Sequence, residues 1–147
     1  MNFSKFRTIV IILVIGLWVT GCAEGPTISH STNFQAEPSA GLTRIFIYRT
    51  KNMFGAAIQP KVKVNGEETG TCKPNGVFSV DVPKSVHRIS VSSETTDRIL
   101  VNTSRSGTVY IKCKPALGVV IYRLKLEQMS AAEGESDIKD LSYTGAY

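Results

Sequence analysis

The residue types that hydrolases use occur together in one stretch of the chain, where Asp81, His87 and Ser90 lie within ten residues. A serine nucleophile needs a histidine as general base and a carboxylate that orients it, all three in contact. This serine is not part of a Gly-x-Ser-x-Gly turn, and proximity along the chain does not bring three side chains into contact. We therefore expect His87 to make structural hydrogen bonds at the start of a strand, and we predict that the chain is not an enzyme.

Residues that could bind a metal are equally sparse. The chain has two histidines, His30 and His87, and no Cys-x-x-Cys pair. A closed zinc site needs four nitrogen, sulfur or carboxylate ligands, most often supplied by such residues. We expect no metal site, and we expect His30, which lies in a polar stretch, to be solvated.

The first 21 residues have the three zones of an export signal. Residues 1–7 carry two positive charges, residues 9–19 are an unbroken apolar run, and the small residues 20–21 precede Cys22. A membrane-spanning helix needs about 20 apolar residues, which is longer than this run. We predict a cleaved signal peptide over residues 1–21, with a transmembrane anchor as the alternative.

Cys22 is the candidate for covalent modification. The sequence Val19-Thr20-Gly21-Cys22 resembles the lipobox of bacterial lipoproteins. The resemblance implies that the Cys22 sulfur receives diacylglycerol, that the leader is cut just before it, and that the new amino terminus receives an N-acyl chain such as palmitate. One acyl chain holds a protein only marginally, at about 0.8 kcal/mol per buried methylene, whereas two or three hold it durably. We expect no other cofactor; the alternative is ordinary signal cleavage beside an incidental cysteine.

The residues after Cys22 indicate where the protein is held and how. Ala23 follows the modified position, and by resemblance to enterobacterial sorting the absence of Asp there predicts the outer membrane, with the protein facing the periplasm. Residues 22–41 contain several Gly, Pro, Ser and Thr residues and few apolar ones, which is typical of a flexible linker. A single domain is predicted over residues 42–147.

The composition limits the classes of partner. The chain of 147 residues has a formal net charge of +5, and removing the leader leaves 15 basic and 12 acidic residues, a balance of +3. No dense basic block is interleaved with aromatic residues, so we expect no nucleic-acid partner.

From residue 42 onwards, short apolar runs alternate with turn signals, which predicts about eight strands. Residues 45–48 are apolar on both parities, as in a strand covered on both faces, and Asn65-Gly66 favours a type I′ hairpin. In residues 120–127 one parity is apolar and predicts an inner face: Val120, Tyr122, Leu124 and Leu126. The pattern favours an all-β fold, a small antiparallel β-sandwich. Residues 130–140 are expected to form a short helical turn or a loop.

Cys72 and Cys113 remain once Cys22 is set aside. The oxidising periplasm favours pairing of two thiols in one small exported domain. Cys113 shares the parity of the apolar Val109 and Ile111, so we expect it to point inward. A bridge across this loop of roughly 40 residues would stabilise the fold by about 3–4 kcal/mol. Two separately buried thiols are the alternative, because spacing alone does not show whether the two Cβ atoms meet.

Six cations are expected on the outer faces of three strands: Lys61, Lys63, Lys112, Lys114, Arg123 and Lys125. If two of these strands are neighbours, the cations form a patch for an anionic envelope component such as lipopolysaccharide phosphate or peptidoglycan carboxylate. The alternative is an ordinary solvated face, which also protects strand edges from pairing with other chains.

Several segments of the domain share a pattern: residues 43–49 (TRIFIYR), 55–57 (GAA), 60–70 (PKVKVNGEETG), 75–78 (NGVF), 81–83 (DVP), His87 and 107–110 (GTVY). They resemble a family of bacterial lipoproteins known only as a domain of unknown function. The resemblance implies a fold akin to the small transthyretin-like (prealbumin-like) and PEGA-like β-sandwiches, and it implies no catalytic residues. The family usually carries glycine in the turn before the histidine, where this chain has Ser85 and Val86.

These observations predict a cell-envelope lipoprotein, attached to the membrane through Cys22. Its domain is expected to be a non-enzymatic interaction module that binds an envelope protein or cell-wall material. The alternative is a protein inhibitor of an envelope-directed enzyme, which requires a protruding loop. Residues 49–55 (RTKNMFG) are the candidate loop, in which Met53 and Phe54 would carry the inhibition.

Overall fold

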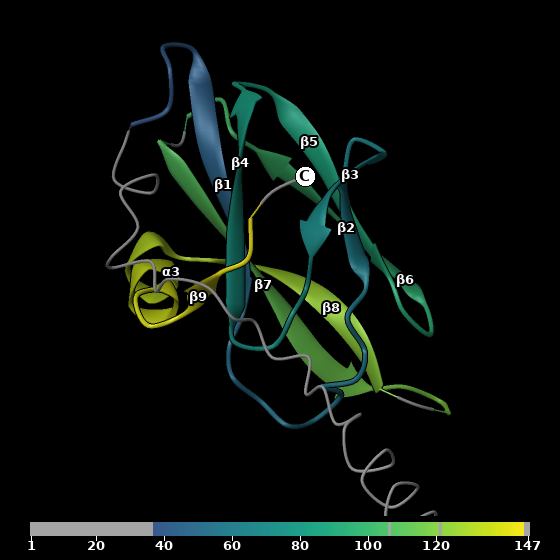
Figure 1. Cartoon of the computed structure of the whole chain (residues 1–147). Helices are drawn as coiled ribbons and strands as arrows, with labels where there is room; N and C mark the ends of the chain where they lie inside the picture. The colour runs from purple at the N-terminus through teal and green to yellow at the C-terminus, as the bar shows by residue number, and fades with distance from the viewer. Residues whose placement is uncertain (1–36, 106, 121, 146–147) are drawn as a thin grey trace, which may run out of the picture.

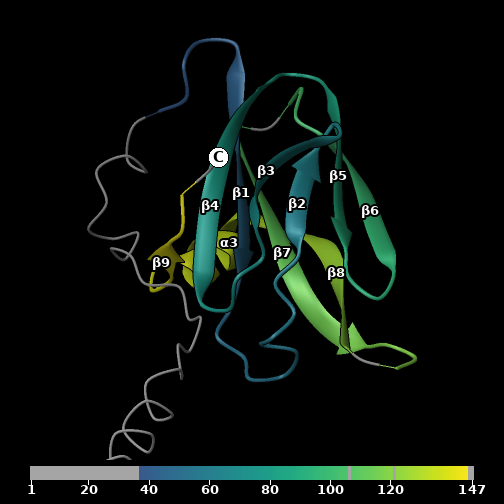
Figure 2. The same cartoon turned by 45° about the vertical axis from the view of Figure 1, so that its right-hand side comes forward.

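The structure is a computed structural model that describes residues 37–105, 107–120 and 122–145. Two β-sheets pack face to face over most of the chain, as Figures 1 and 2 show from two directions. The predicted all-β sandwich is therefore confirmed. The predicted leader, residues 1–21, and most of the predicted linker, including Cys22 and His30, lie outside the described residues.

The first sheet, sheet A, has five strands in the order β8-β7-β1-β4-β9. Their bounds are Leu42–Arg49 for β1, Gly76–Pro83 for β4, Thr108–Leu117 for β7, Tyr122–Met129 for β8 and Ser142–Tyr143 for β9. The second sheet, sheet B, has four strands in the order β3-β2-β5-β6. Their bounds are Lys61–Val64 for β2, Glu67–Thr71 for β3, Val86–Ser92 for β5 and Thr96–Asn102 for β6.

Sheet A is mixed, which differs from the antiparallel sandwich expected from the sequence. Strand β1 pairs with β4 in the antiparallel sense but with β7 in parallel, and β4 pairs with β9 in parallel. Parallel neighbours need a crossover connection. Between β1 and β7 the chain builds β4 and all of sheet B, so the whole second layer serves as this crossover.

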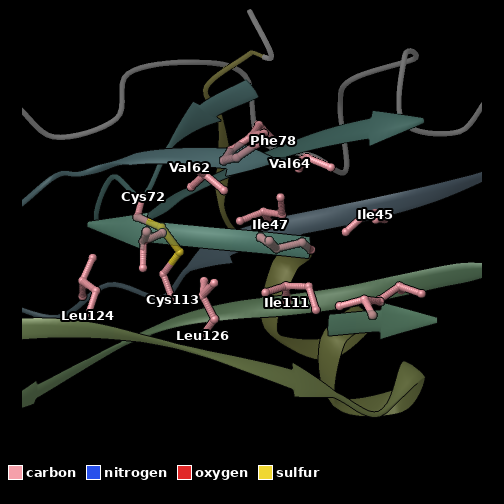
Figure 3. Packing of buried hydrophobic residues seen from close by; sticks show 14 of the residues in the cluster. Ile45, Ile47, Val62, Val64, Cys72, Phe78, Ile111, Cys113, Leu124 and Leu126 are labelled. Carbon is pink, nitrogen blue, oxygen red and sulfur yellow. A yellow bond between two sulfur atoms is a disulfide. The ribbon is translucent and has the colours of Figure 1, made fainter. Parts of the chain in front are cut away.

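Strand β1 lies at the centre of sheet A, which explains why residues 45–48 are apolar on both parities. Ile45 and Ile47 point between the sheets into the main core (Figure 3). Phe46 and Tyr48 point to the outer face. There they pack with Tyr110 and with a helix, α3 (Ala131–Ile138), and the segment after it. The expected double coverage of this strand is confirmed.

Local sequence signals set two of the turns. Asn65 and Gly66 have φ values of 52° and 97°, as the predicted tight hairpin between β2 and β3 requires. Ser130 begins α3 with a capping box, in which its side chain accepts from the Glu133 backbone N–H while the Glu133 carboxylate accepts from the Ser130 N–H. Of the two alternatives for residues 130–140, the helix is the one present.

The outer edge of β8 is covered by side chains of the β5–β6 hairpin rather than by another strand. The Leu124 N–H donates to Ser93 Oγ at 3.1 Å, and the Leu126 N–H donates to Asp97 Oδ2 at 2.7 Å. An exposed edge with free backbone donors would pair with other chains. These two contacts occupy such donors and join sheet B to sheet A along this side.

Candidate functional site

The three residues considered as a catalytic triad do not come together. Asp81 lies on β4 in sheet A and binds Arg44 through both carboxylate oxygens, at 2.7 and 2.8 Å. His87 and Ser90 lie on β5 in sheet B, but they are three positions apart and so point to opposite faces of the strand. His87 is buried on the inner face, whereas Ser90 is half-buried on the outer face. Asp81, His87 and Ser90 therefore form no triad, and the hydroxyl that does lie beside the His87 ring is that of Ser85, with its Oγ 3.1 Å from Nε2.

His87 makes the structural hydrogen bonds that were expected of it. Its Nε2 lies 2.7 Å from the Pro83 carbonyl and its Nδ1 lies 2.9 Å from Asn65 Nδ2. A carbonyl accepts only and an amide nitrogen donates only, so Nε2 carries the proton and Nδ1 accepts. The Asn65 amide is oriented by its own oxygen, which accepts from the Arg88 backbone N–H at 3.0 Å. The ring therefore connects the β2–β3 hairpin to the end of β4.

A buried threonine completes this polar cluster at the end of the sandwich where β1 begins. Thr103 is fully buried, and its hydroxyl lies 3.2 Å from the Pro83 carbonyl and 3.0 Å from the Ser85 carbonyl. The same hydroxyl accepts from the Ser85 N–H at 3.1 Å. The Thr103 hydroxyl thus holds the backbone N–H and carbonyl of Ser85, and the Ser85 hydroxyl lies 3.1 Å from His87 Nε2. The Thr43 hydroxyl donates to the Thr103 carbonyl at 3.3 Å. We call this group, with His87, Asn65 and Thr43, the tether-end cluster, because the predicted linker joins the domain at this end.

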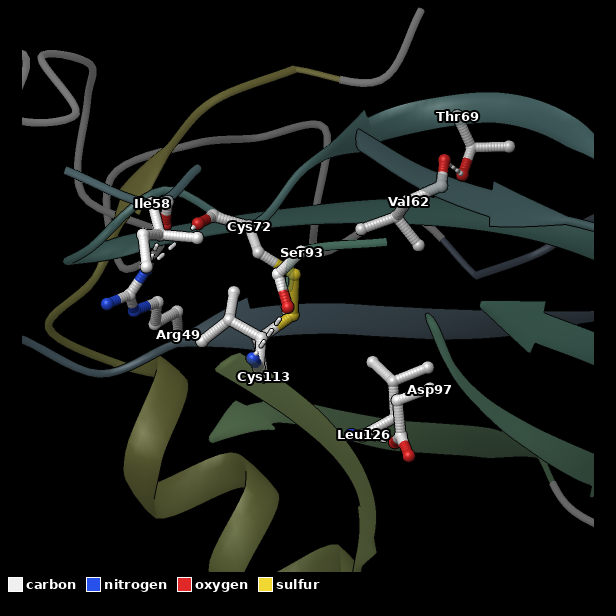
Figure 4. The surroundings of a disulfide bond; sticks show 10 residues. Arg49, Ile58, Val62, Thr69, Cys72, Ser93, Asp97, Cys113 and Leu126 are labelled. Carbon is white, nitrogen blue, oxygen red and sulfur yellow. Dashed lines mark hydrogen bonds between the residues drawn. A yellow bond between two sulfur atoms is a disulfide. The ribbon is translucent and has the colours of Figure 1, made fainter. Parts of the chain in front are cut away.

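Cys72 and Cys113 form a disulfide, as expected (Figure 4). Cys72 follows β3 in sheet B and Cys113 lies on β7 in sheet A, so the bond ties the two layers together. Their Cα atoms are 6.2 Å apart and both side chains are buried. The bridge lies at the end of the sandwich opposite to the tether-end cluster.

The six predicted cations divide between the two outer faces. Lys61 and Lys63 lie on β2 in sheet B, whereas the other four lie on the neighbouring strands β7 and β8 of sheet A. The pairing of these two strands places Lys114 directly opposite Lys125 and Ala116 opposite Arg123. Lys114 also binds Glu127 at 3.1 Å. The four cations of sheet A thus lie on one face of the sheet, where ion pairing neutralises part of their charge.

Lys112 belongs to a separate contact under α3. Its Nζ lies 2.8 Å from Asp137 Oδ2, and the same oxygen accepts from the Tyr48 hydroxyl at 2.8 Å. Burial, with the Asp137 carboxylate adding to it, raises the pKa of Tyr48. Burial alone raises the pKa of Asp137, but hydrogen bonds from Lys112 and Tyr48 more than offset it, so this pKa lies below its ordinary value. The contact fastens the helix to sheet A.

The most unusual surface is apolar and lies at the end of the sandwich away from the tether-end cluster. Two neighbouring loops form it: the β1–β2 loop and the β7–β8 connection, which lie together at the lower end in Figures 1 and 2. We call their five exposed apolar side chains the apolar tip. They are Met53 (86% exposed) and Phe54 (63%) in the first loop, Leu117 (77%) at the end of β7, and Val119 (93%) and Val120 (85%) in the connection.

The two loops of the apolar tip contact each other. The rings of Phe54 and Tyr122 lie 6.0 Å apart, tilted by 59°. Gly55 has a positive φ of 62° and passes so close to Tyr122 that an added Cβ would lie 3.0 Å from the Tyr122 Cβ, so glycine suits this position. A shallow groove of about 250 Å³ runs beside the rings, lined by Asn52, Phe54, Pro115, Ala116, Leu117 and Tyr122.

A fully buried arginine holds the loop of the apolar tip from below. Arg49, the last residue of β1, points between the sheets and is 0% exposed. Its Nη1 donates to the Ile58 carbonyl at 2.7 Å and its Nη2 to the carbonyls of Phe54 and Gly55 at 3.0 and 2.9 Å. A fourth, longer contact of 3.5 Å reaches the Cys72 carbonyl beside the disulfide (Figure 4).

The environment of Arg49 is unusual because the four hydrogen bonds of its guanidinium described above all go to backbone carbonyls. Burial lowers the pKa of its guanidinium, and its Nε is buried without a hydrogen-bond partner among the described residues. A buried charge is costly unless its donors are satisfied. The four carbonyls accept hydrogen bonds from the Arg49 guanidinium only while the loop keeps this shape. The loop therefore presents Met53 and Phe54 in one arrangement.

Sequence reasoning identified part of the apolar tip. Residues 49–55 were proposed as a protruding loop, and Met53 and Phe54 are indeed exposed. The prediction that Val120 faces inward was wrong: β8 begins at Tyr122, and Val120 lies in the connection before it, 85% exposed. The burial of Arg49 was missed, although an arginine that directly ends an apolar run offered a signal. Leu124 and Leu126 do face the core.

Neither a membrane-spanning helix nor a metal-ligand cluster is present in the part of the chain that the structure describes. No known protein family matches the chain, and no solved structure matches it. An uncharacterised protein of Haemophilus influenzae is 27% identical over 136 residues, a match that covers 89% of this chain and 80% of that protein. The chain is thus similar, over most of its length, to a protein whose name states no activity.

Proposed function

We propose that the chain is a lipid-anchored protein of the bacterial cell envelope, and that its β-sandwich is a non-enzymatic interaction domain. The leader of residues 1–21 and the lipobox-like sequence ending in Cys22 support the anchor. The separation of Asp81, His87 and Ser90 supports a role other than hydrolysis. The observation that carries the binding role is the apolar tip, because exposed apolar residues gathered in one place mark interaction sites.

The position of the apolar tip suits a protein tethered by its amino-terminal side. Strand β1 begins at Leu42, where the predicted linker joins the domain, and the loop with Met53 and Phe54 follows its other end. Eight residues of strand span about 26 Å. The linker and the apolar tip therefore lie at opposite ends of the domain, so the attachment leaves the tip free to bind.

The rigidity of the tip loop also supports binding. Ordering a flexible loop on association opposes binding, and a loop that is already ordered avoids this loss. Arg49 orders the loop through its contacts with the carbonyls of Phe54, Gly55 and Ile58. We expect the apolar tip to bind without rearrangement of its backbone.

The anchor is tested by feeding an alkyne-bearing palmitate to cells that express the full chain and purifying the protein under denaturing conditions. We expect the wild-type chain to carry the label and the Cys22→Ser variant to lack it. A double variant, Cys72→Ser with Cys113→Ser, is the matched control and should keep the label. An unlabelled wild-type chain would contradict the proposal.

The binding surface is tested by placing a photoreactive phenylalanine analogue at Val119 in intact cells. The control places the same analogue at Leu100, which is 67% exposed and lies on β6, outside the tip. We expect adducts from position 119 that are absent from position 100. Equal products from both positions would show that the apolar tip is not the binding surface.

A second function is favoured by the same loop. A rigid loop with exposed Met53 and Phe54 fits the predicted alternative, an inhibitor that inserts the loop into an enzyme of the envelope. This function predicts that the chain inhibits at least one member of a panel of cell-wall hydrolases. Replacing Met53 and Phe54 by serine should abolish that inhibition, and no inhibition by the wild-type chain would exclude it.

A further inference from the structure

We infer that the apolar tip binds the surface of a bilayer that contains anionic phospholipids, inserting its apolar side chains among the headgroups. The inference rests on the proposed envelope location and names the partner of the proposed interaction domain. Three features support it: the way the apolar side chains project, the charge of the two segments that carry them, and the reach of the linker.

The apolar side chains project from the loops instead of lining a pocket. Four of the five are more than three-quarters exposed, and the most exposed, Val119 at 93%, lies in the β7–β8 connection. A folded protein partner needs pockets that match such projections, whereas the fluid interface of a bilayer accepts them without matching. The groove beside Phe54 is shallow and holds only about 250 Å³. Projecting Phe, Leu, Met and Val side chains fit the boundary between headgroups and acyl chains.

The two segments that form the tip carry positive charge only. Residues 49–63 and residues 112–126 contain no Asp or Glu. Their eight basic residues are Arg49, Lys51, Lys61, Lys63, Lys112, Lys114, Arg123 and Lys125. Arg49 is fully buried, and three of the lysines form ion pairs: Lys63 with Glu68, Lys112 with Asp137 and Lys114 with Glu127. All six cations predicted as an anionic-ligand patch are among them. A basic segment beside an apolar one is attracted to anionic lipid headgroups, and the attraction grows with each cation near the surface.

Four of these cations, Lys51, Lys61, Arg123 and Lys125, flank the apolar tip on both sides. Lys51 is exposed in the tip loop itself, and Lys61 lies where that loop enters β2 in sheet B. On the other side, Arg123 and Lys125 lie on the outer face of sheet A, within a few residues of Tyr122. A partner on one outer face would meet only one of these groups. A broad anionic surface lying across the end of the sandwich would meet both.

The Glu94 carboxylate contacts the apolar tip itself and bears on its charge. Glu94, from the β5–β6 hairpin, accepts from the backbone N–H of Val119 at 2.9 and 3.0 Å and from that of Val120 at 2.8 Å. Its charge is therefore engaged by backbone donors of the connection. The contact orients the connection so that the side chains of Val119 and Val120 point outward, which supports insertion.

The linker is long enough to let the tip reach a membrane. The 20 residues from Cys22 to Gly41 span at most about 70 Å when extended, whereas β1 spans about 26 Å. The tip can therefore reach the bilayer that holds the lipid, although the linker joins the opposite end of the domain. Tethering raises the local concentration of the tip at the surface, so a weak contact suffices.

The test uses the mature chain, residues 22–147, with Cys22→Ser so that no acyl chain contributes. Its one native tryptophan, Trp18, lies in the leader, so the variant Phe54→Trp introduces a single fluorescent probe. We expect its emission to shift to shorter wavelength with vesicles of phosphatidylglycerol and to stay unchanged with vesicles of phosphatidylcholine. The control variant Leu100→Trp, on sheet B, should show no shift with either vesicle.

Two further variants separate the apolar contribution from the charge. Val119→Ser should weaken binding to phosphatidylglycerol vesicles by about 10-fold, the effect of removing one apolar side chain from the interface. Lys51→Glu with Lys125→Glu should weaken binding at low salt, and high salt should weaken the binding of the wild-type chain. Binding that is unchanged in both variants would overturn the inference, as would an emission shift from Leu100→Trp.

The outcomes separate this inference from the proposed function. If the Phe54→Trp emission does not shift with phosphatidylglycerol while Val119 crosslinks to a protein in cells, the lipid partner is wrong and the interaction domain stands. If the emission shifts but Cys22 carries no lipid, the anchor is wrong and the surface chemistry of the tip stands.

Discussion

At the end of the sandwich where β1 begins, polar side chains share hydrogen bonds with one another and with the backbone: His87, Asn65, Ser85 and Thr103. At the other end a charged side chain, Arg49, is buried under a loop and bonded to its carbonyls. The tether-end cluster keeps its polar groups engaged within the domain. The apolar tip has its support inside and its apolar side chains outside, which is the arrangement expected of a surface that binds.

The largest expected effect comes from removing the support of the apolar tip. Arg49→Ala leaves the carbonyls of Phe54, Gly55 and Ile58 without their donor and opens a cavity between the sheets. We expect the free energy of unfolding to fall by about 3–5 kcal/mol, measured by urea denaturation. The control is Arg88→Ala, an exposed arginine on β5, which should change it by less than about 0.5 kcal/mol. Equal stability of the two variants would contradict the role given to Arg49.

The disulfide supports the same end. Replacing Cys72 and Cys113 by alanine together should lower the free energy of unfolding by about 3–4 kcal/mol, because the unfolded chain gains the freedom of an open loop. The wild-type chain in the presence of a reductant should show the same loss in its urea midpoint. If the two measurements disagree, the alanine side chains have an effect of their own.

The tether-end cluster should respond less. His87→Ala removes the acceptor of the Asn65 side chain amide and one donor to the Pro83 carbonyl, which keeps a second donor in Thr103. We expect a loss of about 1–3 kcal/mol in the free energy of unfolding. Ser90→Ala, on the opposite face of the same strand, should cost much less. A larger loss from Ser90→Ala would show that the outer face of β5 matters more than the cluster.

Acid should weaken the attachment of α3. The folded-state pKa of Asp137 lies below its ordinary value of about 3.9, so between the two values the unfolded chain binds more protons. The resulting stability is present above the ordinary pKa and is lost as pH falls through the folded-state value. Thermal unfolding should therefore show that the wild-type chain loses more stability than the Asp137→Asn variant as pH falls from about 5 to about 2. This is roughly the window that these pKa values define. A parallel decline of both would contradict the ion pair with Lys112.

The smallest expected effect on folding is at the apolar tip itself. Phe54→Ser and Val119→Ser remove side chains that are 63% and 93% exposed, so each should change the free energy of unfolding by less than about 0.5 kcal/mol. The same substitutions are expected to reduce binding. A large loss of stability would show that the tip is part of the core and would remove the contrast between the two ends.

Local signals in the sequence predicted most of the sandwich. Alternation identified β2 and the inner residues of β8, Asn65-Gly66 identified the hairpin, and the parity of Cys113 predicted that it points inward. Each of these features depends on neighbours along the chain or on a single strand. Local sequence signals were therefore sufficient to predict them, and the structure confirms the predictions.

The remaining features depend on contacts that no local pattern encodes. The parallel pairing of β1 with β7 and the two-residue strand β9 follow from how distant segments pack. Val120 continues the alternation of β8 and yet lies outside it, because Glu94 holds its backbone N–H in the connection. The burial of Arg49 required knowing that a loop would fold back over the end of β1.

The place of β1 in sheet A has a consequence for the order of assembly. Its two neighbours are β4 and β7, and β7 begins at Thr108, more than 60 residues after β1 begins at Leu42. A chain that emerges from a ribosome or a translocation channel in sequence order therefore makes its central strand first and completes its surroundings late. Folds dominated by such distant pairings form slowly. Until Thr108–Leu117 has emerged, β1 lacks its parallel neighbour, so the last side of the central strand to be paired is the one that waits for β7.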